Sequence, residues 1–229
     1  MDDMRIASHR LPRVKVMANR VELVQSYCEE KNVLHLGCVG SLESFDKGYS
    51  LHQKISEVAA RVIGVDADEQ AIEYLRPKGI QDLVCADVQA PGALKIPEIK
   101  EPVDVVVAGE LLEHLPNPGL CLENIAGVMD RQSILLVTVP NAFSLRNFFL
   151  VLLRNRERIR ADHNYYFSYT TIKRLLTSSG FMIVNILACS DLQIARNRVR
   201  RIAKRIFNKT ALRYSPFTAE AIIVIAKPV

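Results

Sequence analysis

The stretch VLHLGCVGS, residues 33–41, decides the fold expected for this chain, because a short apolar run ends at Gly37 and leads into a glycine-containing turn. Four more runs of this kind follow: RVIGVD (61–66), DLVCAD (82–87), VDVVVAGE (103–110) and SILLVTVP (133–140). Their β-branched residues are typical of strands buried on both faces of a parallel sheet. Helix-like stretches at 68–75 and 117–129 lie between runs, so the sequence predicts βαβ crossovers and a Rossmann-like, doubly wound α/β sheet.

The rest of the chain is expected to complete a single domain over residues 1–229. We predict two last strands, at 181–189 and 219–228, which pair as an antiparallel hairpin at one edge of the sheet. A helix over 170–178 precedes them, and Gly180 is its stop signal. Three further segments are an N-terminal helical layer (1–32), a long connection with the apolar helix LRNFFLVLL (141–169), and a basic crossover insertion (192–213).

The composition is that of a globular protein: of 229 residues, 49% are apolar and 24% are charged, which excludes collagen-like and wholly disordered chains. No apolar run reaches the roughly 18–20 residues that a membrane-spanning helix needs. The N-terminal residues lack the apolar core of a secretory signal. Five cysteines without a CxxC pair argue against a disulfide framework and a structural zinc site. We expect each cysteine in the core and a cytoplasmic protein.

The positive charge is concentrated at the C-terminal end. The segment from Asp191 to Val229 contains nine basic and two acidic residues, a formal charge of +7, which leaves −2 for residues 1–190. Any electrostatic attraction to nucleic acid or membrane must therefore come from this end of the chain.

Chemistry-bearing residues follow the ends of four predicted strands, where ligands bind in open parallel sheets. Gly37 and Gly40 allow close approach of the backbone to a ligand. Asp66 ends the second strand, and its carboxylate is suited to accept both hydroxyls of a ribose. Asp87 ends the third and is suited to an exocyclic amine such as that of adenine, while Glu110 ends the fourth. Together they indicate a nucleoside-bearing cofactor; without a full GxGxxG or a phosphate-binding lysine, a dinucleotide or ATP fits poorly.

With these residues in place, the sequence resembles the class I S-adenosylmethionine-dependent methyltransferases. The motifs VLHLGCVGS, VIGVDAD, VCADV and AGELLEHLPNP carry the resemblance, together with PNAFSL and YFSYTTIKRLLTSSGF. It implies a seven-stranded sheet with the last strand antiparallel, and S-adenosylmethionine as cofactor with S-adenosylhomocysteine as product. By position, Gly37, Gly40 and Glu110 would lie at the methionine part, Asp66 at the ribose, and Ala67, Asp87 and Val88 at the adenine. The sequence departs from the family pattern at His35, where an acid is usual, and at Val39 and Ser41, where glycines are common.

Methyl transfer to an oxygen needs alignment and removal of a proton. The candidate catalytic residues are His114 and His163. In ELLEH, Glu110, Glu113 and His114 have the spacing i, i+3, i+4, which on a helix would place them on one face. With His163 they could hold a divalent metal, as in metal-using O-methyltransferases with an ExxEH motif, but LEHL also occurs in relatives without a metal. Asp162 is a candidate to orient His163, and Tyr165, Tyr166 and Phe167 to form a lid on the acceptor pocket.

The basic segment 192–213 is amphipathic on a helical projection and leaves three alternatives: a crossover helix packed on the sheet, a contact with an anionic membrane surface, or a nucleic-acid contact. Without tryptophan or an RNA-binding module, a small-molecule, glycan or lipid-linked acceptor ranks above RNA. We therefore expect O-methylation of a small-molecule or sugar-like hydroxyl by a cytoplasmic enzyme. Its basic segment 192–213 would allow peripheral attachment to the inner membrane surface. The alternatives are a metal-dependent RNA 2′-O-methyltransferase and a non-catalytic scaffold.

Overall fold

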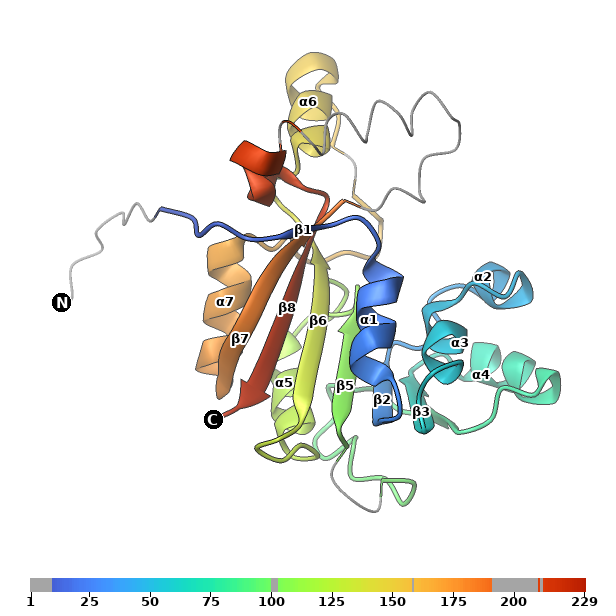
Figure 1. Cartoon of the computed structure of the whole chain (residues 1–229). Helices are drawn as coiled ribbons and strands as arrows, with labels where there is room; N and C mark the ends of the chain where they lie inside the picture. The colour runs from blue at the N-terminus through green and yellow to red at the C-terminus, as the bar shows by residue number, and fades with distance from the viewer. Residues whose placement is uncertain (1–9, 100–102, 158, 191–209, 211) are drawn as a thin grey trace.

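The computed structural model describes residues 10–99, 103–157, 159–190, 210 and 212–229 (Figure 1). A single mixed sheet forms its centre, with the strand order β1-β7-β8-β6-β5-β2-β3-β4. The strands are β1 (Val16–Met17), β2 (Asn32–Leu36), β3 (Arg61–Asp66), β4 (Leu83–Cys85), β5 (Val105–Gly109), β6 (Ile134–Pro140), β7 (Phe181–Cys189) and β8 (Ala221–Pro228). The last strand is antiparallel to both of its neighbours, and the other pairs are parallel, as the sequence predicts.

One detail of the predicted sheet is wrong. The sheet has eight strands and not seven, because Val16 and Met17 pair in parallel with Ala188 and Cys189 of β7. The β7–β8 pair is antiparallel as expected, with β8 joined to β6 and with only the two-residue β1 outside β7 in the described sheet. Six consecutive residues of β8 pair with β6, so β8 is interior and is buried on both faces.

Seven α-helices, two short 3₁₀ turns and helical residues at 210 and 212–214 are described. The seven helices and two turns are α1 (Arg20–Cys28), α2 (Leu42–Asp46), α3 (Leu51–Ser56), α4 (Glu69–Leu75), η1 (Arg76–Lys78), α5 (Pro118–Ala126), α6 (Leu145–Arg154), α7 (Tyr169–Ser178) and η3 (Pro216–Thr218). The expected N-terminal helical layer is thus helical only at α1 among its described residues. Helices α4, α5, α6 and α7 confirm the four helical segments expected from the sequence. Most of the basic segment 192–213 lies outside the described residues, and of its described part Leu212 is buried against Ala188 and Ala219.

Both faces of the sheet are covered by helices, which explains the continuous apolar runs. Helices α1 and α3 cover one face, and α5 and α7 cover the other (Figure 1). Along β5, Val105 and Val107 belong to the first layer and Val106 and Ala108 to the second. Successive side chains of a strand point to opposite faces, so every position of such a strand must be apolar. Four of the five cysteines are buried as expected, but Cys85 is exposed.

One polar pair is enclosed in the layer under α1 and α3. His35 of β2 lies with its Nδ1 3.2 Å from Nδ1 of His52 on α3, and the two rings are stacked at a centroid distance of 5.4 Å. Both side chains are almost completely buried, at 2% and 1% exposed. Burial, reinforced by His52, lowers the pKa of His35 well below its ordinary value, and burial lowers the pKa of His52 to about 4. Both rings are therefore neutral at pH 7, and one ring nitrogen can donate to the other.

The sheet topology fixes where a ligand can bind. The chain runs outward from β2 through β3 to β4, and then crosses to β5 on the other side of β2. This reversal of strand order creates a crevice at the carboxyl ends of β2 and β5. The residues that follow β2, β3, β4 and β5 all lie along that edge, because these four strands are parallel neighbours.

Candidate functional site

The turn after β2 forms the first part of this edge. Gly37 and Gly40 have positive φ values of +64° and +54°, which side chains rarely tolerate. The amide of Gly37 donates to the carbonyl of Val65 at 2.8 Å and so attaches the turn to the end of β3. A Cβ atom on Gly37 would lie only 3.0 Å from Cδ1 of Leu111, so a glycine keeps the turn close to the loop that follows β5.

Asp66 at the end of β3 supports the same turn. Its Oδ2 accepts from the amide of Val39 at 2.9 Å, and its Oδ1 accepts from the amide of Asp68 at 3.1 Å. The side chain is half-buried, and each carboxylate oxygen can accept a further hydrogen bond from a ligand. Ala67 follows on the exposed side of the edge, where it can pack against a flat ring.

Asp87 and Val88 follow β4, and their side chains lie in different surroundings. Asp87 is exposed, and its Oδ1 accepts from the amide of Gln89 at 2.9 Å. The side chain of Val88 is only 5% exposed and packs in the core, while its carbonyl accepts from Asn124 at 2.9 Å. Any contact of Val88 with a ligand therefore falls to its backbone.

Glu110 at the end of β5 is held by two partners. Its Oε1 lies 2.9 Å from Nη1 of Arg20 on α1 and accepts from the hydroxyl of Thr138 at 3.2 Å. Its backbone has φ +53°, a conformation that costs energy in a residue other than glycine and is concentrated at functional sites. The amide of Glu110 donates to the carbonyl of Thr138 at 2.8 Å, which helps to maintain this conformation.

The ELLEH segment is a turn and not the helix expected from its spacing. The amide of His114 donates to the carbonyl of Leu111 at 2.9 Å, and no longer helix forms before α5. The turn aims Glu113 and His114 toward His163 from the later connection. One ligand atom from each of these three residues, which we call the EHH cluster, lies within 4.8 Å of the others. Glu110 is not in this cluster, since it pairs with Arg20 instead.

Glu113 is the most unusual member of the EHH cluster. It is completely buried, and neither carboxylate oxygen has a hydrogen-bond partner. Burial, followed by the nearby Glu110 carboxylate, raises the pKa of Glu113 to about 8. A buried carboxylate is normally paired or coordinates a metal, so this position fits a cation. A carboxylate with two imidazoles is a donor set that binds divalent transition metals.

The two histidines meet ring to edge, with centroids 4.4 Å apart. His114 Nδ1 lies 3.2 Å from Oδ2 of Asp162, and Asp162 is itself held by two 3.1 Å hydrogen bonds from Arg160. Asp162 therefore orients His114 and not His163 as expected from the sequence. Nδ1 of His163 is buried without a partner. Burial, and next the adjacent His114, lower the pKa of His163, so its ring is neutral at pH 7.

The connection reaches the turn because the two backbones are joined by hydrogen bonds. The amide of Asn164 donates to the carbonyl of Glu113 at 2.7 Å, and the Asn164 side chain donates to the carbonyl of His114 at 2.6 Å. The Tyr165 hydroxyl donates to the carbonyl of Pro116 at 2.7 Å. Of the three aromatic residues expected to form a lid, only Tyr166 lines a cavity, because Tyr165 binds the turn and Phe167 is buried in the core.

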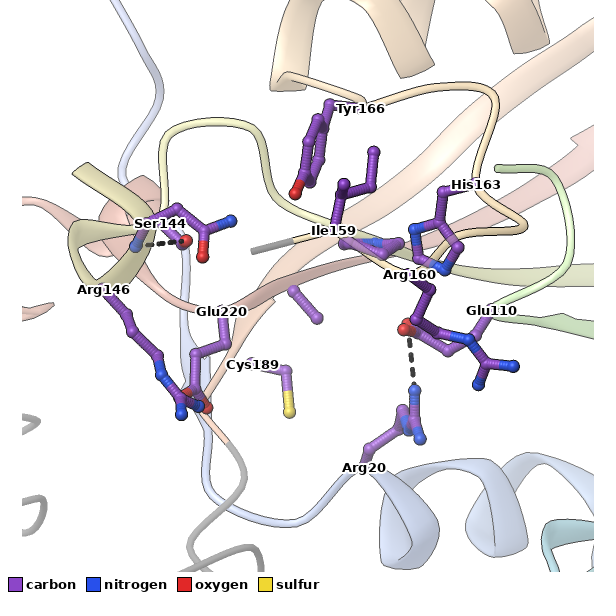
Figure 2. A pocket seen from close by; sticks show the side chains of 13 residues that line it. Arg20, Glu110, Ser144, Arg146, Ile159, Arg160, His163, Tyr166, Cys189 and Glu220 are labelled. Carbon is purple, nitrogen blue, oxygen red and sulfur yellow. Dashed lines mark hydrogen bonds and ion pairs between the residues drawn. The ribbon is translucent and has the colours of Figure 1, made fainter. Parts of the chain in front are cut away.

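A cavity of about 310 Å³ opens between these elements (Figure 2). His163, Arg160 and Glu110 lie on one side of it in Figure 2, and Arg146 and Glu220 lie on the other. The other lining residues are Arg20, Pro140, Ser144, Asn147, Ile159, Tyr166, Cys189 and Ala221. The cavity therefore touches the end of β5, the EHH cluster and the start of α6.

Sequence reasoning missed several of these residues. Arg20 has no motif around it, and its role depends on α1 reaching the end of β5. Arg160 acts by holding Asp162, and Asn164 acts by donating to the carbonyl of His114, 50 residues earlier. Neither contact produces a recognisable pattern in the local sequence. Arg146 follows PNAFS closely, and the polar residues after β6 were a signal that could have drawn attention to it.

Comparison with known proteins identifies one family. The model of a family described as a methyltransferase domain matches residues 14–186, which is more than half of the chain. A crystal structure of a SAM-dependent methyltransferase from Archaeoglobus fulgidus has a TM-score of 0.55 and 22% identity, covering 90% of this chain and 94% of that one. At this identity the likeness shows the fold alone.

Two curated relatives match about half of the chain. A ubiquinone biosynthesis O-methyltransferase from Bradyrhizobium diazoefficiens is 28% identical over 115 residues, which are 49% of this chain and 45% of that protein. A "probable S-adenosylmethionine-dependent methyltransferase" from Mycobacterium tuberculosis is 30% identical over 114 residues, which are 50% of this chain and 37% of that protein. The chain thus spans less than half of the length of either relative.

Proposed function

Because this chain belongs to the class I S-adenosylmethionine-dependent methyltransferase family, we propose that it transfers a methyl group from S-adenosylmethionine to a hydroxyl of a small-molecule or sugar-like acceptor. The observation that carries this proposal is the position of the EHH cluster, which adjoins both the cavity and the strand end that bears Glu110. The name of the Bradyrhizobium relative favours oxygen as the methylated atom.

The cofactor would lie along the carboxyl ends of the strands. Asp66 would accept the ribose hydroxyls, and Asp87 would accept the adenine amine, with Ala67 and the Val88 backbone beside the ring. Gly37 and Gly40 leave room for the methionine part. Glu110 is a carboxylate that lines the cavity at the end of β5, and Arg20 would keep it in place while it binds the ammonium group of the cofactor.

When bound, S-adenosylmethionine would supply the methyl group to the acceptor oxygen and would leave as S-adenosylhomocysteine. The acceptor must also lose its hydroxyl proton, and His163 is suited to accept it because it is neutral at pH 7 and lines the cavity. His114, oriented by Asp162, is positioned next to that ring.

A divalent metal is the second group that this site fits. Glu113, His114 and His163 would hold it, since the buried Glu113 carboxylate has two oxygens without partners. When bound, such an ion supplies a lower pKa for a coordinated hydroxyl. Asp162 would then orient a metal-binding histidine through Nδ1, an arrangement common around protein-bound metals.

Two other functions remain as alternatives from the sequence. A metal-dependent RNA 2′-O-methyltransferase would use the same EHH cluster, and salt-sensitive RNA binding that depends on the cations of 192–213 would favour it. A non-catalytic scaffold would bind cofactor without turnover on any acceptor. We place the small-molecule acceptor first because the cavity of about 310 Å³ suits a small ligand.

Replacing Asp66 with alanine is expected to weaken binding of S-adenosylhomocysteine about 100-fold or more, since both ribose hydroxyls lose their acceptor and hydrogen bonds to a charged acceptor are worth about 1.5–3 kcal/mol each. Isothermal titration calorimetry on wild type and variant measures this loss. Asp104→Ala is the matched control. This substitution removes a carboxylate that accepts a hydrogen bond from the backbone amide of Asn32 at 2.8 Å. Asp104 precedes β5 and therefore lies at the opposite edge of the sheet from Asp66.

Unchanged affinity in Asp66→Ala would remove the assigned cofactor site, and absence of binding to wild type would remove the cofactor from the proposal. Because Asp66 also accepts two backbone amides, the melting temperature of each variant is measured without ligand. A loss of affinity counts only where this unliganded protein remains folded.

A further inference from the structure

Helix α6 carries the largest group of exposed apolar side chains in the described part of the chain. Phe143 just before it, together with Phe148, Phe149, Val151, Leu152 and Leu153, forms what we call the α6 apolar surface. Their exposed fractions run from 47% at Phe149 to 72% at Leu153. No residue of the helix is buried, and in Figure 1 the helix stands at the end of the molecule, away from the layers that cover the sheet.

This exposure is unusual for a helix of this length. Its ends are well formed, since the Ser144 hydroxyl accepts from the amide of Asn147 and Asn155 closes the helix in a left-handed conformation. However, helices shorter than about 12–15 residues are marginal in water, and most helical stability in proteins comes from packing an apolar face. A contiguous exposed apolar patch generally marks an interaction site. The α6 apolar surface therefore needs a partner.

Charges around the surface indicate what kind of partner it has. Arg146 and Arg154 lie on α6, and Arg156 follows it; all three side chains are exposed, although Nη1 of Arg146 also lies 3.8 Å from Oε1 of Glu220. Glu157 is the acid that accompanies them in this segment. An amphipathic helix with phenylalanine and leucine on one face and arginine at its polar border is suited to the interface of an anionic bilayer. Each such cation adds about 1 kcal/mol of attraction near the surface.

A second copy of the chain fits less well. Two α6 helices packed through this surface would bring the cations at their borders close together, with Glu157 as the nearby acid just after each helix. Anionic headgroups would neutralise the same cations. The position of α6 would also bring a candidate ligand site to the membrane, because an apolar groove of about 480 Å³ runs beside the helix. The groove is lined by Phe143, Phe148 and Val151, and it shares Asn147 and Tyr166 with the cavity described above.

We propose that α6 is a membrane-docking helix that inserts Phe148, Phe149, Leu152 and Leu153 into the headgroup region of an anionic lipid bilayer. Docking in this position turns the groove and the adjoining cavity toward the lipid. The proposal does not depend on methyl transfer, because it rests on the exposed face of the helix and on its arginines.

Vesicle co-sedimentation tests it with the full-length protein. Wild type should bind vesicles that contain phosphatidylglycerol and bind pure phosphatidylcholine weakly. The variant Leu152→Ser/Leu153→Ser changes no charge and should reduce the vesicle partition coefficient about tenfold or more. Its matched control is Met182→Ser/Val184→Ser on β7, whose side chains are similarly exposed at 55% and 53% and which should bind as wild type does.

The charge contribution is tested separately. Arg154→Gln/Arg156→Gln should weaken binding to anionic vesicles and leave circular dichroism unchanged. Wild type that does not bind anionic vesicles at low salt overturns the proposal, as does a Leu152→Ser/Leu153→Ser variant that binds like wild type. Concentration-dependent dimerisation that this variant abolishes, without vesicle binding by wild type, would assign the surface to a second copy and also overturn it.

Discussion

Replacing Glu113 with glutamine is expected to weaken Mn²⁺ binding by about 1,000-fold or more and to stabilise the metal-free protein at the same time. Glutamine keeps the size of the side chain but removes the negative charge that the EHH cluster offers to a cation. Without a cation the side chain must take up a proton on folding, because burial with both oxygens unbonded raises its pKa to about 8. At pH 7 this protonation costs about 3 kcal/mol of stability, of which a buried amide costs back about 1–3 kcal/mol.

These two opposite effects make the experiment specific. Isothermal titration with Mn²⁺ gives the affinity, and urea unfolding with a chelator gives the free energy of unfolding. Glu123→Gln on α5 is the control, since that carboxylate is exposed and the same chemical change there should alter neither quantity. A gain in stability with no metal binding by wild type would reduce Glu113 to a destabilising core residue and leave His163 as the proton acceptor.

The second large effect is expected from the buried pair His35 and His52. Both folded-state pKa values lie below the ordinary value of 6.5, and that of His52 is about 4. As the pH falls, the histidines of the unfolded chain therefore take up protons before those of the folded protein. The free energy of unfolding has its full value above pH 6.5 and decreases below it. Two protons correspond to about 2.7 kcal/mol per pH unit.

Urea unfolding between pH 5 and pH 7.5 measures this slope. Glu113 acts in the opposite direction over this whole range, because its pKa of about 8 favours the folded state as the pH falls. The difference between wild type and His35→Leu/His52→Leu cancels that contribution and isolates the pair. A difference that does not change between pH 5 and pH 6.5 would mean that the rings are not buried as neutral groups.

The sequence predicts the parallel part of the fold because burial on both faces leaves no choice of residue. Each run from 33–37 to 133–140 is a strand, and the four strand-end residues lie along one edge. The same reasoning applies to β8, which is continuously apolar over AIIVIA and lies between β6 and β7. Strand β1 could not be predicted, because two residues carry no periodicity and their pairing depends on β7.

The candidate site is predictable in its members but not in its contacts. The ELLEH spacing is compatible with a turn as well as with a helix. In both conformations Glu113 and His114 can lie near residues that come much later in the chain. The partner of Asp162 could not be deduced, because its neighbour in sequence, His163, is a more obvious choice than His114, which lies 48 residues away. Arg20 was missed for the same reason: its partner Glu110 is brought to it by the packing of α1.

The hydrogen bonds from Asn164 and Tyr165 to the 113–116 turn serve two purposes at once. The same contacts complete the EHH cluster and form one wall of the cavity, because His163 lies directly beside the residues that hold the connection in place. A cut in the chain between α6 and Arg160 would thus leave every residue assigned to cofactor binding on one fragment and His163 on the other.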